Sequence, residues 1–307
     1  MVSRTPHILV VGTGAMASLF AARFSASGLS VRMLGTWIES IEALNKFGVR
    51  FIDEDGRESV YPVEATDDPE KCVGSQFAII LVKSYQTQQV ALRLAKCLAD
   101  DGLALTLQNG LDNHKTLAEV LGEQRVASGV TTVGATLIAP GIVRMGGKGV
   151  ISLGNHEHLK TLVDLLIRAG FEVETVENTD SLIWGKLVIN AAINPLTALL
   201  KVPNGDLLEI PPARKMMNLV TIETIDVAST VAISLPFSDP VAAVESVAQQ
   251  TASNYSSMHK DVSRGSQTEI DAINGAIVRV GETAGASVDF NRMLWLLVKA
   301  MTIKSAA

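Results

Sequence analysis

The first apolar runs of the chain enclose a segment of helical spacing. Residues 7–11 are a short apolar run, residues 15–27 have helical spacing that ends at Gly28, and residues 30–34 have the pattern of a second strand. Two strands joined by a crossing helix lie parallel. The pattern therefore predicts that the chain opens with a strand-helix-strand unit of the mononucleotide-binding kind.

Strand patterns continue this organisation as far as residue 176. Residues 77–82 and 103–107 are continuous apolar runs, and residues 88–99 between them have helical spacing. Residues 49–65 instead hold two β-rich runs around an Asp-Gly pair, which favours a hairpin. The remaining predicted elements are strands within residues 126–136 and 141–154, a helix at 158–169 and a last strand at 171–176.

Helical spacing replaces the strand pattern after residue 177 and dominates the rest of the chain. A chain of 307 residues is also longer than a single hydrophobic core usually serves. We therefore predict an α/β fold with two domains. An N-terminal Rossmann-type parallel-sheet domain, residues 1–178, binds a dinucleotide, and an all-helical C-terminal domain, residues 179–307, carries substrate and catalysis.

Composition excludes several classes of function. Hydrophobic residues make up 47% of the chain and charged residues 19%, which is not the composition of a disordered protein. The formal net charge of −6 argues against a nucleic-acid partner, and the apolar segments end short of the roughly 20 residues that a membrane span needs. Cys72 and Cys97 fit neither a disulfide framework nor a metal pattern. We expect reduced thiols, a cytoplasmic location and no membrane partner.

The turn after the first predicted strand matches the dinucleotide signature G-x-G-x-x-A. The first glycine permits the tight turn, the second lets backbone approach a pyrophosphate, and the small third residue keeps the helix near the sheet. A turn without a ligand is the alternative, which the complete strand-helix-strand context disfavours. The predicted cofactor-binding residues of this loop are Gly12, Thr13, Gly14, Ala15, Met16 and Ala17.

The end of the second strand bears on the choice of dinucleotide. NAD-preferring proteins place an acidic residue there to bind the ribose 2′-hydroxyl. Here the chain continues Gly35-Thr36-Trp37, without an acid, and Thr36 can donate a hydrogen bond to a 2′-phosphate. We therefore favour NADP and keep NAD open, because no arginine occupies this tip.

Two polar residues follow predicted strands at their carboxyl ends. Lys83 follows the run at 77–82, and Asn109 follows the run at 103–107. Ligands of open α/β sheets bind beyond these ends, so both side chains are candidates for contact with cofactor or substrate. A solvated loop lysine and a plain Asn-Gly turn are the alternatives.

A polar stripe runs along an otherwise apolar helical segment. Residues 182–196 read LIWGKLVINAAINPL, and Lys186, Asn190 and Asn194 share one face at intervals of four residues. A lysine is ordinarily solvated, but burying an ammonium and two amides is costly unless a ligand pairs with them. An inter-domain cavity holding an anionic carbonyl compound would supply that pairing. Lys186 could then protonate the carbonyl oxygen as hydride arrives.

Glu269 has a structural explanation from the sequence alone. Residues 266–269 read Ser-Gln-Thr-Glu ahead of an apolar helical pattern, which predicts a capping box at a helix start. The five histidines show no metal-ligand spacing, and no G-x-S-x-G elbow is present. We expect no metal and no acyl-enzyme chemistry.

These motifs together resemble the ketopantoate reductases, also called 2-dehydropantoate 2-reductases, over nearly the whole chain. The last three of the following motifs are specific in combination. They are GTGAMA at residues 12–17, VKSYQ at 82–86, LQNGL at 107–111, GKLVINAAINPLTAL at 185–199, PNG at 203–205 and SSMHKDVSRGSQTEIDAING at 256–275.

The resemblance implies roles for individual residues. Lys186 would be the proton donor to the keto oxygen, and Glu269 would help hold the cofactor ribose and the substrate. Lys83 and Asn109 would contact the cofactor, and Asn109 the substrate as well. Further substrate contacts would be Asn190, Asn194, Asn204, Asn254 and Ser257.

The residues alone leave some of these roles open, and the chain departs from the family at two positions. Asn204 is equally explained by a Pro-Asn-Gly turn, and Asn254 and Ser257 by a helix cap. Ala17 stands where the third glycine is usual. Thr36 stands where members often carry arginine for the 2′-phosphate.

We expect an oxidoreductase that reduces 2-dehydropantoate to (R)-pantoate by hydride transfer from NADPH, with Lys186 as general acid. The expected partner is a small 2-oxo acid, and a homodimer is one oligomeric state that the sequence allows. One alternative is a related reductase of another small 2-oxo acid. The other is a dinucleotide-binding regulator without catalysis, which the polar stripe disfavours.

Overall fold

The computed structural model describes residues 8–304, and the chain divides into two compact units. The first unit consists of Met1–Gln108 and Asn113–Thr179, and the second of Asn109–Asp112 and Asp180–Ala307. One short segment from the first half of the chain thus belongs to the second unit. The functional roles that the sequence assigned to the two domains stay a prediction.

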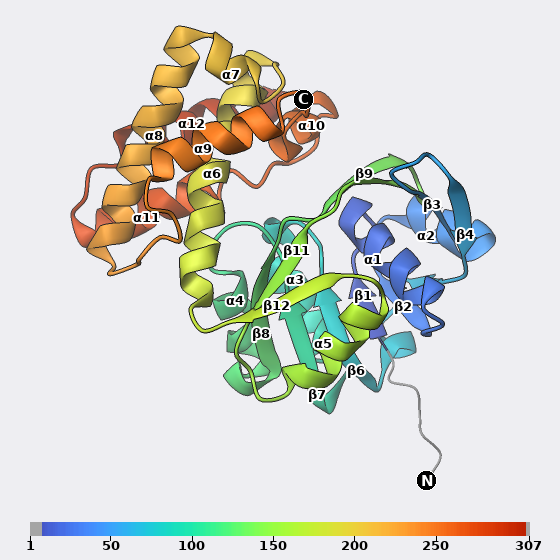
Figure 1. The fold of residues 1–307 in the computed structure, drawn as a ribbon. Helices are drawn as coiled ribbons and strands as arrows, with labels where there is room; N and C mark the ends of the chain where they lie inside the picture. Colours follow the sequence, from blue (N-terminus) through green and yellow to red (C-terminus); the bar gives the residue numbers. More distant parts are fainter. Residues whose placement is uncertain (1–7, 305–307) are drawn as a thin grey trace. The chain divides into compact units, whose positions relative to one another are not determined.

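An eight-stranded sheet forms the centre of the first unit. His7, predicted as part of the first strand, lies outside the described residues. The strands are β1 Ile8–Val11, β2 Val31–Leu34, β5 Glu64–Thr66, β6 Ser75–Ile80, β7 Leu98–Thr106, β8 Val126–Thr131, β11 Val150–Gly154 and β12 Glu172–Val176. Their order is β12-β11-β8-β7-β6-β1-β2-β5, and every neighbouring pair is parallel except β11 with β8 (Figure 1). The predicted parallel sheet is confirmed.

Helices cover both faces of this sheet, which is why its strands are apolar on both sides. Ile8 and Val10 of β1 pack into one hydrophobic cluster, whereas Leu9 and Val11 pack into another on the opposite face. Helices α1, α2 and α5 contribute to the first cluster, and α3 and α4 to the second. The helices are α1 Ala15–Ala26, α2 Ile38–Phe47, α3 Thr87–Leu94, α4 Asn113–Leu121 and α5 Leu159–Arg168.

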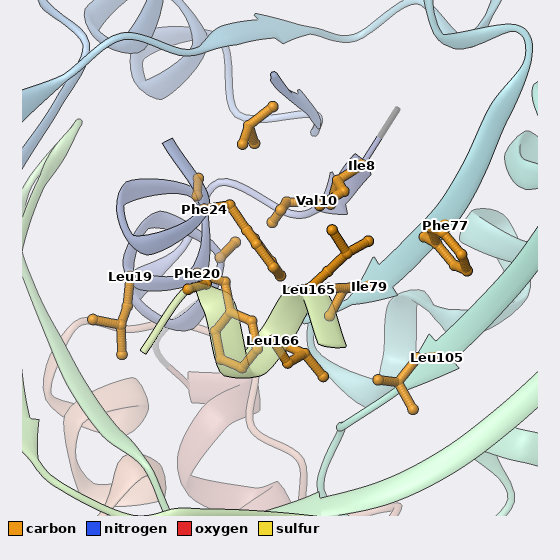
Figure 2. Packing of buried hydrophobic residues seen from close by; sticks show 14 of the residues in the cluster. Ile8, Val10, Leu19, Phe20, Phe24, Phe77, Ile79, Leu105, Leu165 and Leu166 are labelled. Carbon is orange, nitrogen blue, oxygen red and sulfur yellow. The ribbon is translucent and has the colours of Figure 1, made fainter. Parts of the chain in front are cut away.

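A second sheet of four strands packs on α1 and buries it on a further side. Its order is β4-β3-β10-β9, and the strands are β3 Val49–Ile52, β4 Glu58–Tyr61, β9 Gly134–Ala139 and β10 Ile142–Gly147. The aromatic rings of α1 face the main sheet and α5 (Figure 2). The ring of Phe20 stacks on Phe171, with 4.4 Å between their centroids. This packing fixes the position of α1 and so of the glycine loop that precedes it.

The sequence predicted this second sheet only in part. The hairpin within residues 49–65 is confirmed as the antiparallel pair β3 and β4. The strands predicted within 126–136 and 141–154 instead divide between the two sheets, because β9 and β10 pair with each other and β10 pairs with β3. This pairing joins segments far apart in the sequence, which local patterns do not specify.

The helix predicted at residues 88–99 was too long. Helix α3 ends at Leu94, and β7 already begins at Leu98. The carbonyl of Cys97 accepts hydrogen bonds from the backbone of Gly74 and Ser75, at 3.0 and 3.2 Å. Pairing with the start of β6 therefore overrides the local helical tendency.

The second unit consists of helices joined by turns and loops, with no strand among its described residues, as predicted. Helix α6 forms its core. By length and apolarity α6 could cross a membrane. However, 67% of its most apolar stretch is buried inside the protein, as in the core helix of a globular unit. The helices are α6 Thr179–Leu200, α7 Asp206–Glu209, α8 Pro211–Thr230, α9 Pro240–Gln250, α10 Ser257–Ser263, α11 Asn274–Ala284 and α12 Asp289–Lys304.

Candidate active site

The glycine loop lies between β1 and α1 in a geometry suited to a phosphate. Gly12 has a φ of +121°, which favours glycine, and a Cβ there would lie 3.3 Å from the side chain of Ala17. A Cβ on Gly14 would meet nothing within 4 Å, so the space in front of it is open. Gly14 is also the N-cap of α1 and provides no side-chain hydrogen bond to the helix start. The first N–H groups of α1 are thus available to an anion.

The side chain of Thr13 points into the protein and not toward the open space at Gly14. Its side chain is buried and packs against Gly35, where a Cβ would lie only 2.7 Å from the Thr13 Cγ2 atom. Ser40 Oγ donates to the Thr13 carbonyl oxygen at 3.1 Å. The Thr13 side chain therefore joins the loop to the end of β2.

The end of β2 carries a cation that the sequence analysis missed. Arg93 of α3 donates from Nη1 and Nη2 to the carbonyl oxygen of Gly35, both at 3.2 Å, and from Nη2 to that of Asp67. Thr36, the next residue after Gly35, is exposed. A guanidinium thus lies next to the tip where the sequence offered only a hydroxyl. Arg93 is 58 residues away in sequence, so no local motif could reveal it.

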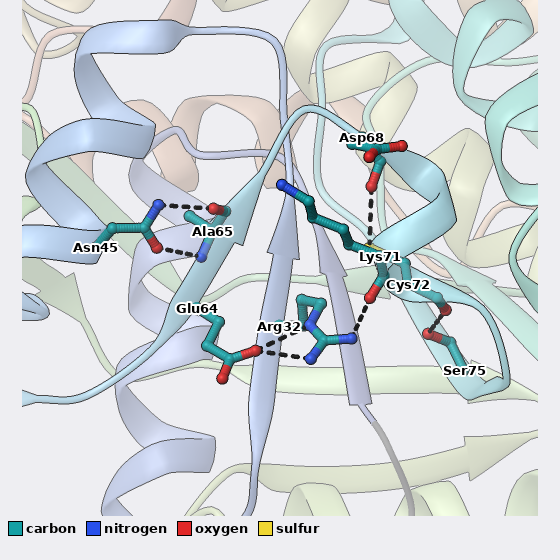
Figure 3. A network of polar contacts seen from close by, with 8 residues as sticks. All are labelled: Arg32, Asn45, Glu64, Ala65, Asp68, Lys71, Cys72 and Ser75. Atoms are coloured by element: carbon teal, nitrogen blue, oxygen red, sulfur yellow. Dashed lines mark hydrogen bonds and ion pairs between the residues drawn. The ribbon is translucent and has the colours of Figure 1, made fainter.

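Arg32, by contrast, is held along the sheet edge. Its Nε and Nη2 donate to Glu64 Oε2 at 3.1 and 2.7 Å, and its Nη1 donates to the carbonyl of Lys71 (Figure 3). The register of β2 and β5 places Arg32 directly opposite Glu64. Asn45 of α2 bonds both backbone groups of Ala65 at 2.8 Å and so covers the edge strand β5. Arg32 is a structural residue here.

Lys83 is partly buried in the turn after β6. Gln108, at the end of β7, holds this turn: its Nε2 donates to the Val82 carbonyl at 3.1 Å and to Thr87 Oγ1 at 2.9 Å. Gln108 lies inside the LQNGL motif, yet the motif did not identify this bracing role. The two strand-end loops are thereby fixed to each other.

Asn109 lies with the second unit. The backbone N–H of Leu111 donates to the Ala272 carbonyl at 3.1 Å, and Asp112 forms an ion pair with Arg279 at 3.5 Å. Asn109 Nδ2 lies 3.4 Å from Glu269 Oε2. The segment that follows β7 therefore brings the two predicted residues Asn109 and Glu269 together.

Glu269 is not part of a helix-capping box, which corrects the sequence prediction. Helix α11 begins only at Asn274, and Glu269 lies in the turn before it. The backbone carbonyl of Glu269 accepts hydrogen bonds from the N–H groups of Ala272 and Ile273, at 3.0 and 3.1 Å. Its side chain is 6% exposed and is directed at Asn109. The hydrogen bond from Leu111 to the Ala272 carbonyl holds this turn, and α11 starts after it.

The polar stripe lies on α6 as the spacing predicted. Lys186 and Asn190 are partly buried and Asn194 is 7% exposed. Burial lowers the pKa of the Lys186 ammonium to about 8, while the negative charge of Glu269 acts in the opposite direction and raises it. A lysine with a pKa close to neutrality can release a proton to a substrate far more readily than a solvated one.

The residues predicted after α6 differ in their surroundings. Asn204 is buried, and its Nδ2 donates to Thr251 Oγ1 at 2.8 Å, while its Oδ1 has no hydrogen-bond partner. Its backbone N–H donates to the carbonyl of Asn254 at 2.9 Å. The side chains of Asn254 and Ser257 are exposed.

Ser256 is the buried serine of this region, and the sequence analysis did not select it. Its Oγ accepts from the His259 backbone at 3.0 Å and so caps α10, and it accepts from Thr197 Oγ1 at 2.7 Å. Thr197 belongs to α6. The start of α10 is thereby attached to the helix that carries Lys186.

Family models match both parts of the chain. The model described as ketopantoate reductase PanE/ApbA matches residues 8–158, and its C-terminal counterpart matches residues 178–302. A 2-dehydropantoate 2-reductase of Archaeoglobus fulgidus is 34% identical over 97% of this chain and 98% of its own length. One of Halobacterium salinarum is 31% identical over 95% of this chain and 98% of its own.

This chain belongs to the ketopantoate reductase family. It is accordingly an oxidoreductase of that family, and the resemblance drawn from its motifs is confirmed.

Solved structures extend the comparison to the fold of ketopantoate reductases. A PanE/ApbA family ketopantoate reductase from Ralstonia eutropha JMP134 has a TM-score of 0.92 at 32% identity and covers 98% of this chain and 100% of its own. D-mandelate dehydrogenase in a ternary structure with NADH and anilino(oxo)acetate also has a TM-score of 0.92, at 26% identity, over 98% and 99% of the two chains. The same architecture therefore serves proteins named for different substrates.

Proposed function

We propose that this chain reduces 2-dehydropantoate to (R)-pantoate, with NADPH as hydride donor and Lys186 as general acid. The observation that carries the proposal is the partly buried ammonium of Lys186 on an apolar helix, with a pKa of about 8 and the buried carboxylate of Glu269 acting on it. The name shared by the curated relatives, over nearly their whole length, supports the substrate.

The first unit has the features needed to hold a nicotinamide dinucleotide. The uncapped start of α1 and the open space at Gly14 suit a pyrophosphate, and one solved neighbour is a complex with NADH. When bound, the reduced dinucleotide supplies the hydride. The absence of an acid at Thr36, together with the guanidinium of Arg93 beside it, favours NADPH over NADH.

Lys186 would supply the proton of the reaction. As hydride adds to the keto carbon, the carbonyl π electrons move to oxygen, and the N–H bond of the Lys186 ammonium breaks to give the new hydroxyl. Lysine is left neutral and is reprotonated from solvent. Glu269 would favour the charged form before each turnover, because its carboxylate raises the pKa that burial lowers.

Amide side chains would orient the substrate. Asn190 and Asn194 lie one and two turns after Lys186 on the same helix face, so their amides can bond the substrate carboxylate and hydroxyl. We assign the remaining contacts to Asn204, Asn254 and Ser257, and the cofactor contacts to Lys83 and Asn109. These assignments rest on the family motifs.

A related 2-oxo acid is the second candidate substrate. D-mandelate dehydrogenase has the same fold and its structure contains anilino(oxo)acetate, so the architecture accepts a bulkier 2-oxo acid. This alternative keeps the same roles for Lys186 and the dinucleotide.

Oxidation of NADPH and NADH can be followed with 2-dehydropantoate, an aromatic 2-oxo acid and unbranched 2-oxo acids. We expect the highest kcat/KM with 2-dehydropantoate and NADPH. A higher value for another 2-oxo acid would identify the second candidate. Tight NADPH binding without turnover of any of them would instead indicate a non-catalytic dinucleotide-binding protein.

A further inference from the structure

Pro195 interrupts the backbone hydrogen bonding of α6. In an α-helix the N–H of residue 195 would donate to the carbonyl of Ala191, but proline has no N–H. Pro195 lies inside α6, and both it and Ala191 are buried. A buried carbonyl needs a hydrogen-bond donor, and Pro195 cannot provide the usual one.

Asn274 provides that donor. Its Nδ2 lies 3.1 Å from the Ala191 carbonyl oxygen, and its side chain is 0% exposed. Asn274 is the first residue of α11. One amide therefore connects α6, at the point where proline weakens it, to the start of another helix.

A chain of buried hydrogen bonds fixes the orientation of this amide. The carboxylate of Glu223 accepts from Asn291 Nδ2 at 2.8 Å, so the Oδ1 of Asn291 faces the other way and accepts from Asn274 Nδ2 at 3.0 Å. A carboxylate accepts only, which leaves the two amides a single consistent orientation. Glu223 also accepts from the backbone of Phe290 and Asn291, at 2.9 and 2.7 Å, in the first turn of α12.

Asn274 also stands close in sequence to Glu269, the buried carboxylate beside Asn109. Glu269 precedes it by one turn, in which the Gly275 N–H donates to the Ile270 carbonyl at 2.9 Å. Ala191, at the other end of the bond, is the neighbour of Asn190 in the polar stripe. The amide thus joins the turn that carries Glu269 to the helix that carries Lys186.

We propose that Asn274 is a positioning residue, which sets the register of α6 against the Glu269 turn by donating to the carbonyl that Pro195 leaves free. Its effect on the reaction passes through the alignment of Lys186 and Glu269. The inference therefore rests on the proposed function of Lys186. The inference names the Ala191 carbonyl as the group that needs the donor. A backbone N–H restored at position 195 should therefore replace the Asn274 amide.

The test compares Asn274→Ala, Pro195→Ala and the double variant. We expect N274A to lower kcat at least tenfold and to accelerate hydrogen–deuterium exchange in residues 187–200, while the Kd for NADPH stays within twofold. P195A should stay within threefold of the original kcat. In the double variant the alanine N–H donates to Ala191, so kcat and exchange should return to within threefold of P195A.

Val244→Ala is the matched control. Val244 is fully buried in α9 and has no part in the amide chain. V244A should lower Tm as a cavity mutation does, with kcat and the exchange of α6 unchanged below the transition. This separates a positioning effect from general loss of stability.

Two results would overturn the inference. One is an N274A protein that loses Tm like V244A but keeps kcat and α6 exchange. The other is a double variant that falls more than tenfold below P195A; this comparison also decides the matter if N274A alone does not fold. Failure of the proposed function is distinguishable, since the original chain would then turn over no 2-oxo acid while the exchange measurements still report on α6.

Discussion

Lys186 is the residue whose chemistry depends most on its surroundings. The ordinary pKa of a lysine is 10.5, and burial on α6 brings that of Lys186 to about 8 against the raising effect of Glu269. At pH 7 the ammonium form still predominates, about ten to one, so the group is charged and yet a competent acid. The same residue type on the protein surface would not combine these properties.

The rate of reduction should fall as pH rises through about 8. The proton-donating form of Lys186 is present below its pKa and is lost above it, so kcat for reduction decreases with pH, and the reverse oxidation, which needs neutral lysine, increases. Initial rates in both directions between about pH 6 and pH 10 measure this dependence. A reduction rate that does not change across this range would contradict the role.

Lys186→Arg is the sharper substitution because it keeps the charge. Arginine stays protonated at all working pH values, so K186R should lose roughly 10²–10⁴-fold in kcat, and the pH dependence near 8 should disappear. Lys186→Met serves as the uncharged comparison. NADPH binding by fluorescence should remain in both, and full turnover by K186R would exclude general-acid catalysis by this lysine.

The pH dependence of the free energy of unfolding provides an independent measure of the Lys186 pKa. Because the folded pKa of Lys186 lies below its ordinary value, the unfolded chain binds more protons between about pH 8 and 10.5. The contribution of this residue to the free energy of unfolding therefore rises with pH across that window. K186M should remove this part of the slope in denaturant titrations.

Thr36 tests the cofactor preference at the residue scale. A carboxylate beside the β2 tip would repel a 2′-phosphate and accept from a 2′-hydroxyl. Thr36→Glu should therefore raise the Kd for NADPH at least tenfold and lower that for NADH, whereas Thr36→Val changes both far less. Equal effects of T36E on the two dinucleotides would place the 2′-phosphate elsewhere.

At the scale of elements, the segment Asn109–Asp112 packs closely against the turn that carries Glu269. Gly110 has a φ of +87°, and a Cβ on it would lie 2.5 Å from the Ala272 carbonyl oxygen. The backbone must approach this closely for Leu111 to bond Ala272 and for Asn109 to reach Glu269. Glycine is required there by space as well as by conformation.

Gly110→Ala should consequently be worse than an ordinary glycine substitution. Gly122 offers the matched control, because its φ of +91° is nearly the same and a Cβ there meets nothing within 4 Å. G122A should lose about 1–3 kcal/mol from backbone strain alone. G110A should lose more, and should also lower kcat. Similar stability and activity in the two variants would show that the segment shifts without consequence.

At the scale of the whole molecule, ligand binding should stabilise one unit before the other. A dinucleotide that binds the folded first unit, and not the unfolded chain, raises the unfolding free energy of that unit by RT ln(1 + [L]/Kd), about 2.7 kcal/mol at a hundredfold excess over Kd. We expect NADPH to raise the calorimetric transition of the first unit, and NADH at the same concentration to raise it less. A larger shift with NADH, or none with either, would contradict the assigned cofactor. The homodimer that the sequence allows stays a prediction.

Much of the first unit was predictable because its signals are local. The turn at Gly12, the spacing of Ala17 and the alternation of apolar residues each concern neighbouring positions. The polar stripe of Lys186, Asn190 and Asn194 was likewise visible, since residues four apart share a helix face. The order of the strands beyond the opening strand-helix-strand motif could not be predicted from the sequence. Neither could the separate four-stranded sheet.

What the sequence determined by itself was the family, the fold class and the candidate lysine, because those depend on motifs and periodicity. Only the tertiary structure decided the rest. It brought Arg93 to the β2 tip, directed Glu269 at Asn109 instead of a helix start, and supplied the Ala191 carbonyl with a donor from Asn274. Each of these contacts joins residues 58 or more positions apart, and contact at such separations is a result of packing that no local pattern records.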